Sequence, residues 1–198
     1  MKNHNTPILQ TERLILRKFT ENDIEDLFHI YKDEEVNTYL PWFPLKSLEE
    51  AEMFYKDKYE KAYQLDNGYR YAICLKTDNV PIGYVNVSID DNHDLGYGLR
   101  KEFWHRGIVT EASKAVIEQV KKDGLLYVTA THDIKNPRSG RVMKQLGMSY
   151  KYSYEEQWQP KDILVTFRMY QLNFDGLNER VYKKYWDTYP VHFIEKDV

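Results

Sequence analysis

Apolar residues in the first part of the chain follow first a strand-like and then a helix-like spacing. Residues 13–17 (RLILR) alternate apolar and polar positions, which predicts a short strand. Thr20 with the acidic Asp23 three positions later is typical of a helix N-terminus, and apolar residues then recur at helical spacing. The two prolines of 39–44 (YLPWFP) must end this helix, because proline lacks the amide hydrogen that a helix needs. Ser47 begins a second predicted helix.

The rest of the chain adds strands and helices in a mixed order. Strands are expected at 69–76, 81–89, 93–99, 125–131, 148–155 and 163–170, and helices from about 108 to 122 and at 137–146. The resulting order is β-αα-βββ-α-β-α-ββ. This order indicates an α/β (α+β) fold with a mixed central sheet of about seven strands flanked by helices, because a doubly wound fold would alternate strictly.

The length of 198 residues suits one domain with a continuous core. We interpret residues 1–172 as that domain and residues 173–198 as a C-terminal extension. Several aromatic residues lie among the charges of the extension, namely Tyr182, Tyr185, Trp186 and Tyr189. A helical tail packed back on the domain is the preferred interpretation, and a dimer contact or a lid is the alternative. The chain is therefore expected to be a monomer or a homodimer.

Charge and cysteine content argue against several classes of function. The net charge is −3 and the pI about 6.1, so nothing favours binding to nucleic acid or to an anionic membrane. No apolar run approaches bilayer length, and the first ten residues lack the apolar centre of a signal peptide, so a cytoplasmic protein is expected. Cys74 is the only cysteine, which leaves no disulfide and no Cys-based zinc cluster, and no metal is expected.

The segment 95–115 (LGYGLRKEFWHRGIVTEASKA) suggests a phosphate-binding loop. A strand ends at Leu99, a short loop contains Gly107, and a helix begins at once. Such a loop directs free backbone N–H groups and the positive end of the helix dipole toward one point, which favours phosphate. Gly107 permits a close approach, and Arg106 adds a positive charge. A lone glycine here would by itself favour an ordinary strand–loop–helix connection.

Three separated blocks of sequence decide between these interpretations. They read TERLILR at 11–17, GYGL at 96–99 leading to WHRGIVTEA at 104–112, and NPRSGRVMKQLGM at 136–148. Together the blocks resemble the GNAT acetyltransferases, especially the branch of the RimJ/RimL-type ribosomal-protein N-acetyltransferases. The resemblance covers about residues 11–170. It departs from the family at Val109, where Gly or Ala is usual, and at Met148, where Phe is usual.

The resemblance implies an acetyl-CoA-dependent N-acetyltransferase in which an amine attacks the acetyl thioester directly. The alternative is a GNAT-fold module that binds acyl-CoA without turnover. A nucleotide-binding protein is disfavoured, because the loop lacks the Gly-x4-Gly-Lys-Ser/Thr pattern. The positions that match the family's coenzyme site are Tyr97, Leu99, Arg100, Arg106, Gly107, Ile108, Val109, Thr110, Asn136 and Ser139.

The resemblance also implies that two neighbouring parallel strands splay apart to admit the pantetheine arm. The matching strands are 93–99 and 125–131. Alternation along the first of them puts Asp94, Gly96 and Gly98 on one face. Two glycines on one face predict a strip that is free of side chains and accessible to a ligand, although a strand packed tightly on a helix is the alternative.

Candidate catalytic residues follow from the resemblance and from the alternation along strand 93–99. Met143 stands where many GNAT enzymes have a tyrosine that protonates the leaving thiolate, so Ser139 is the candidate proton donor. Its alternative role is that of a small residue in the first turn of a helix. Asp94 is the candidate general base because it is the carboxylate on the glycine face. Asp94 and the adjacent His93 both lie close to a turn, where solvated polar residues are common, so a solvated surface residue is the alternative role for each. A base acting through water, or no dedicated base, is the alternative mechanism.

The acceptor site is expected in the loop between the first two helices and in the last two strands. Trp42, Phe43 and Tyr152 are the candidate substrate-binding residues. The same regions also contain Tyr154 and Trp158, with Glu34, Glu35, Glu155 and Glu156 nearby in sequence. An aromatic and acidic pocket would suit a cationic amine, either a small molecule or a protein N-terminus. Packing in the core or at its rim is the alternative role for these rings.

Overall fold

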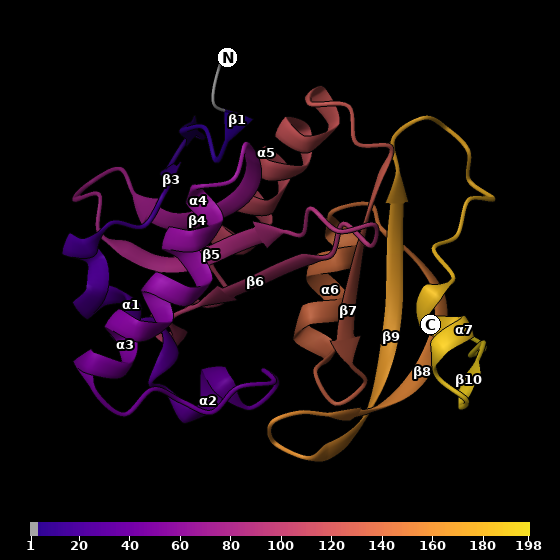
Figure 1. Cartoon of the computed structure of the whole chain (residues 1–198). Helices are drawn as coiled ribbons and strands as arrows, with labels where there is room; N and C mark the ends of the chain where they lie inside the picture. The colour runs from indigo at the N-terminus through magenta and orange to yellow at the C-terminus, as the bar shows by residue number, and fades with distance from the viewer. Residues whose placement is uncertain (1–3) are drawn as a thin grey trace.

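The computed structural model describes residues 4–198, and its strands form two sheets where the sequence predicted one of about seven strands (Figure 1). The first sheet has the order β2 (Leu9–Gln10), β3 (Leu14–Arg17), β4 (Asn67–Leu75), β5 (Pro81–Val87) and β6 (Leu95–Leu99), with β1 (His4–Asn5) paired to β4. The second has the order β10 (His192–Phe193), β8 (Ser149–Trp158), β9 (Ile163–Asn173) and β7 (Tyr127–Asp133). The two-residue strands β1, β2 and β10 are too short for their apolar pattern to predict them.

The helices follow the predicted order, with short additional turns. They are η1 (Glu21–Asp23), α1 (Ile24–Tyr31), α2 (Glu34–Asn37), α3 (Leu48–Tyr55), the π-helical turn η2 (Lys56–Glu60), α4 (Lys61–Tyr63), η3 (Lys101–Phe103), α5 (Ile108–Lys122), α6 (Pro137–Gln145) and α7 (Lys184–Thr188). Within residues 4–198, no helix combines the length and the apolar content needed to cross a bilayer.

Two hydrophobic clusters hold the helices on opposite faces of the first sheet. Alternate residues of β5 show the division, because Val85 packs with the apolar stripe of α5 whereas Tyr84 packs with α1 and α3. Cys74 lies in the second cluster and is fully buried, as expected of a small core residue. The sheet therefore separates the side that carries the phosphate-type loop from the side that carries α1 and α3.

The predicted splay lies between β6 and β7, where the two sheets meet. The only described link along their length is one parallel bridge, between Asp94 and Thr129, and the Thr129 amide donates to the His93 carbonyl oxygen at 3.2 Å. From this bridge β6 runs into the first sheet while β7 continues beside β9 in the second (Figure 1). The opening between the strands is thus closed at Asp94.

Candidate active site

The loop before α5 has the backbone geometry that a phosphate site needs. Gly107 adopts φ +71° and ψ 7°, in the left-handed region that glycine enters without a steric penalty, and it is the N-cap of α5. The Glu111 amide donates to the Gly107 carbonyl oxygen at 3.0 Å, so the helical hydrogen bonds begin there. The amides of the first three residues, 108–110, therefore point out of the helix end toward solvent, because a glycine cap has no side chain to accept from them.

An ion-pair cluster fixes this loop to the start of the chain. Glu111 accepts hydrogen bonds from the Thr11 hydroxyl, the Arg13 amide and the Arg13 guanidinium, and the ion pair with Arg13 is 2.6 Å long. Arg13 also donates to the Arg106 carbonyl oxygen at 3.0 Å. The hydrogen bonds and the charge of Arg13 outweigh partial burial and hold the pKa of Glu111 below its usual value. Two blocks that share a family pattern therefore touch each other in the fold.

The side chains of the loop divide into those that support it and those that stay exposed. Trp104 supports it, because its indole N–H donates to the Leu99 carbonyl oxygen at 2.8 Å. Arg100 pairs with Glu102, whereas Arg106 is exposed and lies over the ring of Phe103. Of the predicted coenzyme residues at the helix start, Ile108 is buried in the core, Val109 is half-buried, and the Thr110 hydroxyl donates to Gln145.

The sheet directs another row of amides toward the splay. The Arg100 amide donates to β5, and the His93 carbonyl oxygen accepts from β7. Because backbone groups alternate sides along a strand, the amides of Tyr97 and Leu99 point away from β5 and toward β7. The two predicted coenzyme residues on β6 thus present backbone donors to the opening.

Tyr97 and Ser139 meet across the splay. The Tyr97 hydroxyl lies 2.9 Å from the Ser139 hydroxyl and also donates to the Ser139 carbonyl oxygen at 3.0 Å. Asn136 is the N-cap of α6, and its side-chain oxygen accepts from the Ser139 amide at 3.4 Å. Burial raises the pKa of Tyr97, so this phenol stays protonated at neutral pH. The sequence placed Ser139 on the first turn of α6 but gave no sign of its partner.

Asp94 lies at the closed end of the splay and is half-buried. Its Oδ1 atom is buried and, within residues 4–198, accepts no hydrogen bond. Burial raises the pKa of Asp94 to about 7, because a charged carboxylate loses solvation that no partner replaces. A carboxyl group with such a pKa can take up a proton at neutral pH and release it again.

The glycine face of β6 is only partly open. A Cβ on Gly98 would lie 2.5 Å from the Tyr84 ring, whereas a Cβ on Gly96 would meet nothing within 4 Å. Tyr84 pairs with Gly98 across β5 and β6, so its ring covers the glycine. The prediction of a free strip along both glycines is therefore wrong at Gly98. It holds at Gly96, which lies next to Asp94 on the same face.

The three predicted acceptor residues lie in different surroundings. Phe43 is 57% exposed. Trp42 packs on Tyr31 in the cluster beneath α1 and α3, and its buried indole N–H finds no acceptor among residues 4–198. Tyr152 is buried and donates to the Tyr182 carbonyl oxygen at 2.7 Å, so it anchors the C-terminal extension. Their role in binding an acceptor stays a prediction.

Known proteins share both the sequence pattern and the fold. The family model described as "Acetyltransferase (GNAT) domain" matches residues 13–149. The N-acetyltransferase YoaA of Bacillus subtilis, itself uncharacterised, is 30% identical over 146 residues, which cover 71% of this chain and 82% of YoaA.

Solved structures agree with this assignment at the level of the fold. The microcin C7 self-immunity acetyltransferase MccE, in complex with acetyl-CoA and AMP, superposes with a TM-score of 0.72 at 17% identity, covering 83% of this chain and 94% of MccE. A proposed ribosomal-protein-serine acetyltransferase from Vibrio cholerae superposes with a TM-score of 0.72 at 18% identity, covering 86% of this chain and 99% of that protein. These comparisons confirm the predicted GNAT fold.

The fold and the loop thus define an acyltransferase scaffold with a backbone-lined opening. The chain belongs to the GNAT acetyltransferase family and is an N-acetyltransferase.

Proposed function

We propose that this protein transfers the acetyl group of acetyl-CoA to a primary amine by direct attack in a ternary complex. The observation that carries the proposal is the arrangement at the splay. Backbone donors of β6 line one side of the opening, and the buried Asp94 carboxyl closes its end. A hydrogen-bond donor for a developing oxyanion and a group that can accept a proton both border the opening, which supports the proposal.

The chain offers a continuous set of contacts for the coenzyme. The three free amides at residues 108–110 suit the pyrophosphate, because they combine hydrogen-bond donors with the positive end of α5. The exposed Arg106 adds charge beside them. The amides of Tyr97 and Leu99 suit the pantetheine arm and the thioester carbonyl, and Asn136 lies at the start of α6 on the far side of the opening.

Each proton has a group that can carry it. The Asp94 carboxylate takes the proton that the attacking amine nitrogen loses as its bond to the acetyl carbon forms. The Tyr97 amide donates to the carbonyl oxygen while negative charge develops on it. The Ser139 hydroxyl, held by its hydrogen bond to the Tyr97 hydroxyl, donates a proton to the departing thiolate and takes a proton back from solvent, to which Asp94 later releases the proton of the amine. The C–N bond forms as the C–S bond breaks, and no acyl-enzyme arises.

The acceptor belongs to the class of protein N-termini or small amines. The three blocks that resemble the RimJ/RimL-type enzymes support a protein N-terminus, and so does the Vibrio cholerae neighbour with its ribosomal-protein description. The half-buried ring of Tyr185, which is hydrogen-bonded to Asn92 just before Asp94, is equally suited to a small cationic amine.

Free-thiol release over a panel of amines tests the proposal. The protein is incubated with acetyl-CoA and peptides with a free or a blocked N-terminus, and CoA binding is measured separately by calorimetry. We expect thiol release only when both acetyl-CoA and a free amine are present. Tight CoA binding without thiol release for any amine would contradict an enzymatic role and would instead identify a binding module.

A further inference from the structure

The C-terminal extension returns across the second sheet next to the proposed catalytic carboxylate. After β9 the chain passes through α7 and pairs β10 with β8, where the Glu155 amide also donates to the Val191 carbonyl oxygen at 3.0 Å (Figure 1). The hydrophobic cluster of this face joins side chains of β8 and β9 to the aromatic side chains of the extension. The extension is therefore packed against the sheet that forms one arm of the splay.

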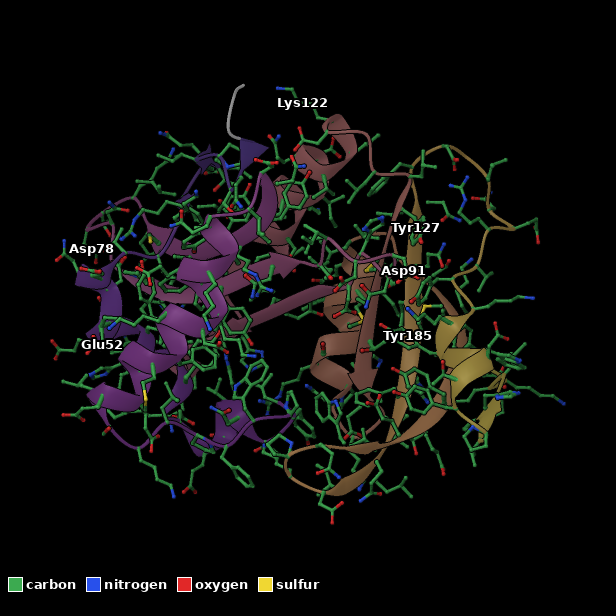
Figure 2. All side chains as sticks on the ribbon, viewed as in Figure 1. Glu52, Asp78, Asp91, Lys122, Tyr127 and Tyr185 are labelled. Carbon is green, nitrogen blue, oxygen red and sulfur yellow. The ribbon has the colours of Figure 1, made fainter. Side chains whose placement is uncertain are left out.

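Polar contacts fix α7 to the turn that precedes Asp94. The Tyr182 hydroxyl donates to Asp91 Oδ1 at 3.1 Å, and Lys184 Nζ lies 3.5 Å from the same oxygen. The side-chain Nδ2 of Asn92 donates to the Tyr185 hydroxyl at 2.8 Å. Figure 2 shows Asp91, Tyr127 and Tyr185 gathered at this place, and the Tyr127 hydroxyl donates to the Asp91 carbonyl oxygen. These contacts join segments about ninety residues apart beside the bridge at Asp94.

Three tyrosine rings face one another at this junction. Tyr154 of β8 stacks with Tyr185, with 5.1 Å between the ring centroids and 17° between the ring planes. It also stacks with Tyr189, at a centroid distance of 4.9 Å and an interplanar angle of 16°. Burial and the neighbouring Asp94 carboxylate raise the pKa of Tyr185. The Asp94 charge also contributes to the raised pKa of Tyr154, after burial and the nearer Tyr185 and Glu156. Asp94 therefore lies within electrostatic reach of two rings of the stack.

Two of these three rings border a cleft that opens to solvent. A cleft of about 390 Å³ lies between the turn at 90–92 and α7, and Tyr185 and Tyr189 line it. The charges beside the rings are mainly acidic. Glu156 contacts Tyr189, and burial raises the pKa of this glutamate. Lys184 is the cation of the cleft lining, and it is paired with Asp91.

From this juxtaposition we propose that Tyr185 and Tyr189, with Tyr154, form a wall of the acceptor site. The wall receives an amine that carries no carboxylate next to the reacting nitrogen. Aromatic faces attract an ammonium group, and the acidic side chains repel a carboxylate. The acceptor class is thus an amine on a neutral or cationic carrier, such as an amidated or peptide-linked residue, in preference to a free amino acid. This inference rests on the proposed function, since it takes Asp94 as the site of amine deprotonation.

The test compares L-alaninamide and L-alanine, which differ in the carboxylate and hence also in the pKa of the amine, so kcat/KM is expressed per deprotonated amine. The wild type is compared with Tyr185→Ala, Tyr185→Phe and Trp186→Phe. Trp186→Phe is the matched control, because Trp186 is adjacent on α7 but packs on Tyr152 and His192. Tyr189→Ala is a second variant in case Tyr185→Ala melts at a lower temperature.

We expect the wild type to prefer alaninamide at least tenfold in kcat/KM. Loss of the ring in Tyr185→Ala should raise the KM for alaninamide by about tenfold, since a desolvated cation–ring contact is lost. The KM for acetyl-CoA should stay within about twofold of the wild-type value, because the wall contacts the acceptor and not the coenzyme. Tyr185→Phe should restore most of the affinity, and Trp186→Phe should behave as the wild type.

Two results would overturn the wall. One is equal use of alanine and alaninamide by the wild type, and the other is an unchanged amine KM in both Tyr185→Ala and Tyr189→Ala. If the wild type releases no thiol with any amine, the proposed function fails on its own. In that case the wall is tested by measuring with NMR how tightly alaninamide binds to the complex of the protein with CoA. Equal affinities of the wild type and Tyr185→Ala would refute the wall.

Discussion

Replacing Asp94 with asparagine tests whether the Asp94 carboxyl group has a catalytic or only a structural role. Burial raises the pKa of Asp94 from the ordinary 3.8 to about 7. With that value only about one tenth of the carboxyl groups are ionised at pH 6, and about nine tenths at pH 8. We therefore expect kcat/KM for the amine to have an inflection near pH 7 in the wild type, on top of the slower rise caused by deprotonation of the free amine.

Asp94→Asn keeps the size of the side chain but cannot accept the proton. General-base catalysis contributes a factor of about 10² to 10⁴, so we expect kcat to fall by that amount at pH 8. The inflection near pH 7 should disappear, while the affinity for CoA should stay within about twofold. The assay is thiol release between pH 5.5 and 8.5, with CoA affinity measured by calorimetry.

The same substitution should stabilise the folded protein at high pH. A folded-state pKa above the unfolded one means that the folded state binds the proton more tightly, so stability falls as pH rises from about 4 to about 7. A pKa raised by about 3 corresponds to at most about 4 kcal/mol, and solvent at this half-buried site reduces it, so we expect a gain of about 1–3 kcal/mol at pH 8. The gain should be small at pH 4, where the wild-type carboxyl is protonated.

The combination of lower activity and higher stability is the signature of a functional group held in an unfavourable environment. Thermal melts of wild type and Asp94→Asn at pH 4 and pH 8 measure it. An Asp94→Asn variant that keeps the inflection near pH 7 would refute the role of Asp94 as base. A variant that is less stable than the wild type at pH 8 would refute the environment described for it.

Further predictions concern the coenzyme loop and the proton donor. Gly107→Glu should abolish CoA binding in calorimetry with the circular dichroism spectrum retained, because it adds bulk and negative charge where the amides converge, and retained affinity would contradict the loop assignment. Ser139→Ala should lower kcat more than CoA affinity, and kinetics equal to the wild type would exclude Ser139 as donor. Glu111→Gln should lower the free energy of unfolding by about 1–3 kcal/mol in urea, since it breaks a charged network with Thr11 and Arg13, and an unchanged midpoint would contradict that account.

The elements that the sequence predicted correctly are those with a local cause. The helix α5 begins at Ile108 as predicted, because the glycine before it and the apolar stripe after it lie in one continuous segment. The strands from 67 to 99 were predicted within a few residues for the same reason. The splay between β6 and β7 was expected from the family resemblance alone, because the bridge between Asp94 and Thr129 at its closed end joins distant residues that no local pattern records.

In the candidate site, too, the features with a local cause could be predicted from the sequence, whereas those that depend on distant residues could not. Gly107 and the amides after it could be inferred from one loop, because phosphate recognition by a helix end needs little beyond the backbone itself. The contact of Tyr97 with Ser139 joins residues 42 positions apart. The covering of Gly98 by Tyr84 depends on the register of two strands, so alternation along one strand alone wrongly predicted an open face there.

The acceptor side is the part for which sequence patterns were least informative, and the structure supplies a physical reason. The proposed wall combines Tyr154 of β8 with two tyrosines of an extension whose contacts with the turn before β6 span about 90 residues. The family model matches residues 13–149, a range that contains neither Tyr154 nor the extension. In the proposed site, donor binding relies on backbone groups that many sequences can supply, whereas acceptor choice relies on side chains of a segment outside that range. We therefore expect variation in the extension to change the acceptor while the donor site stays the same.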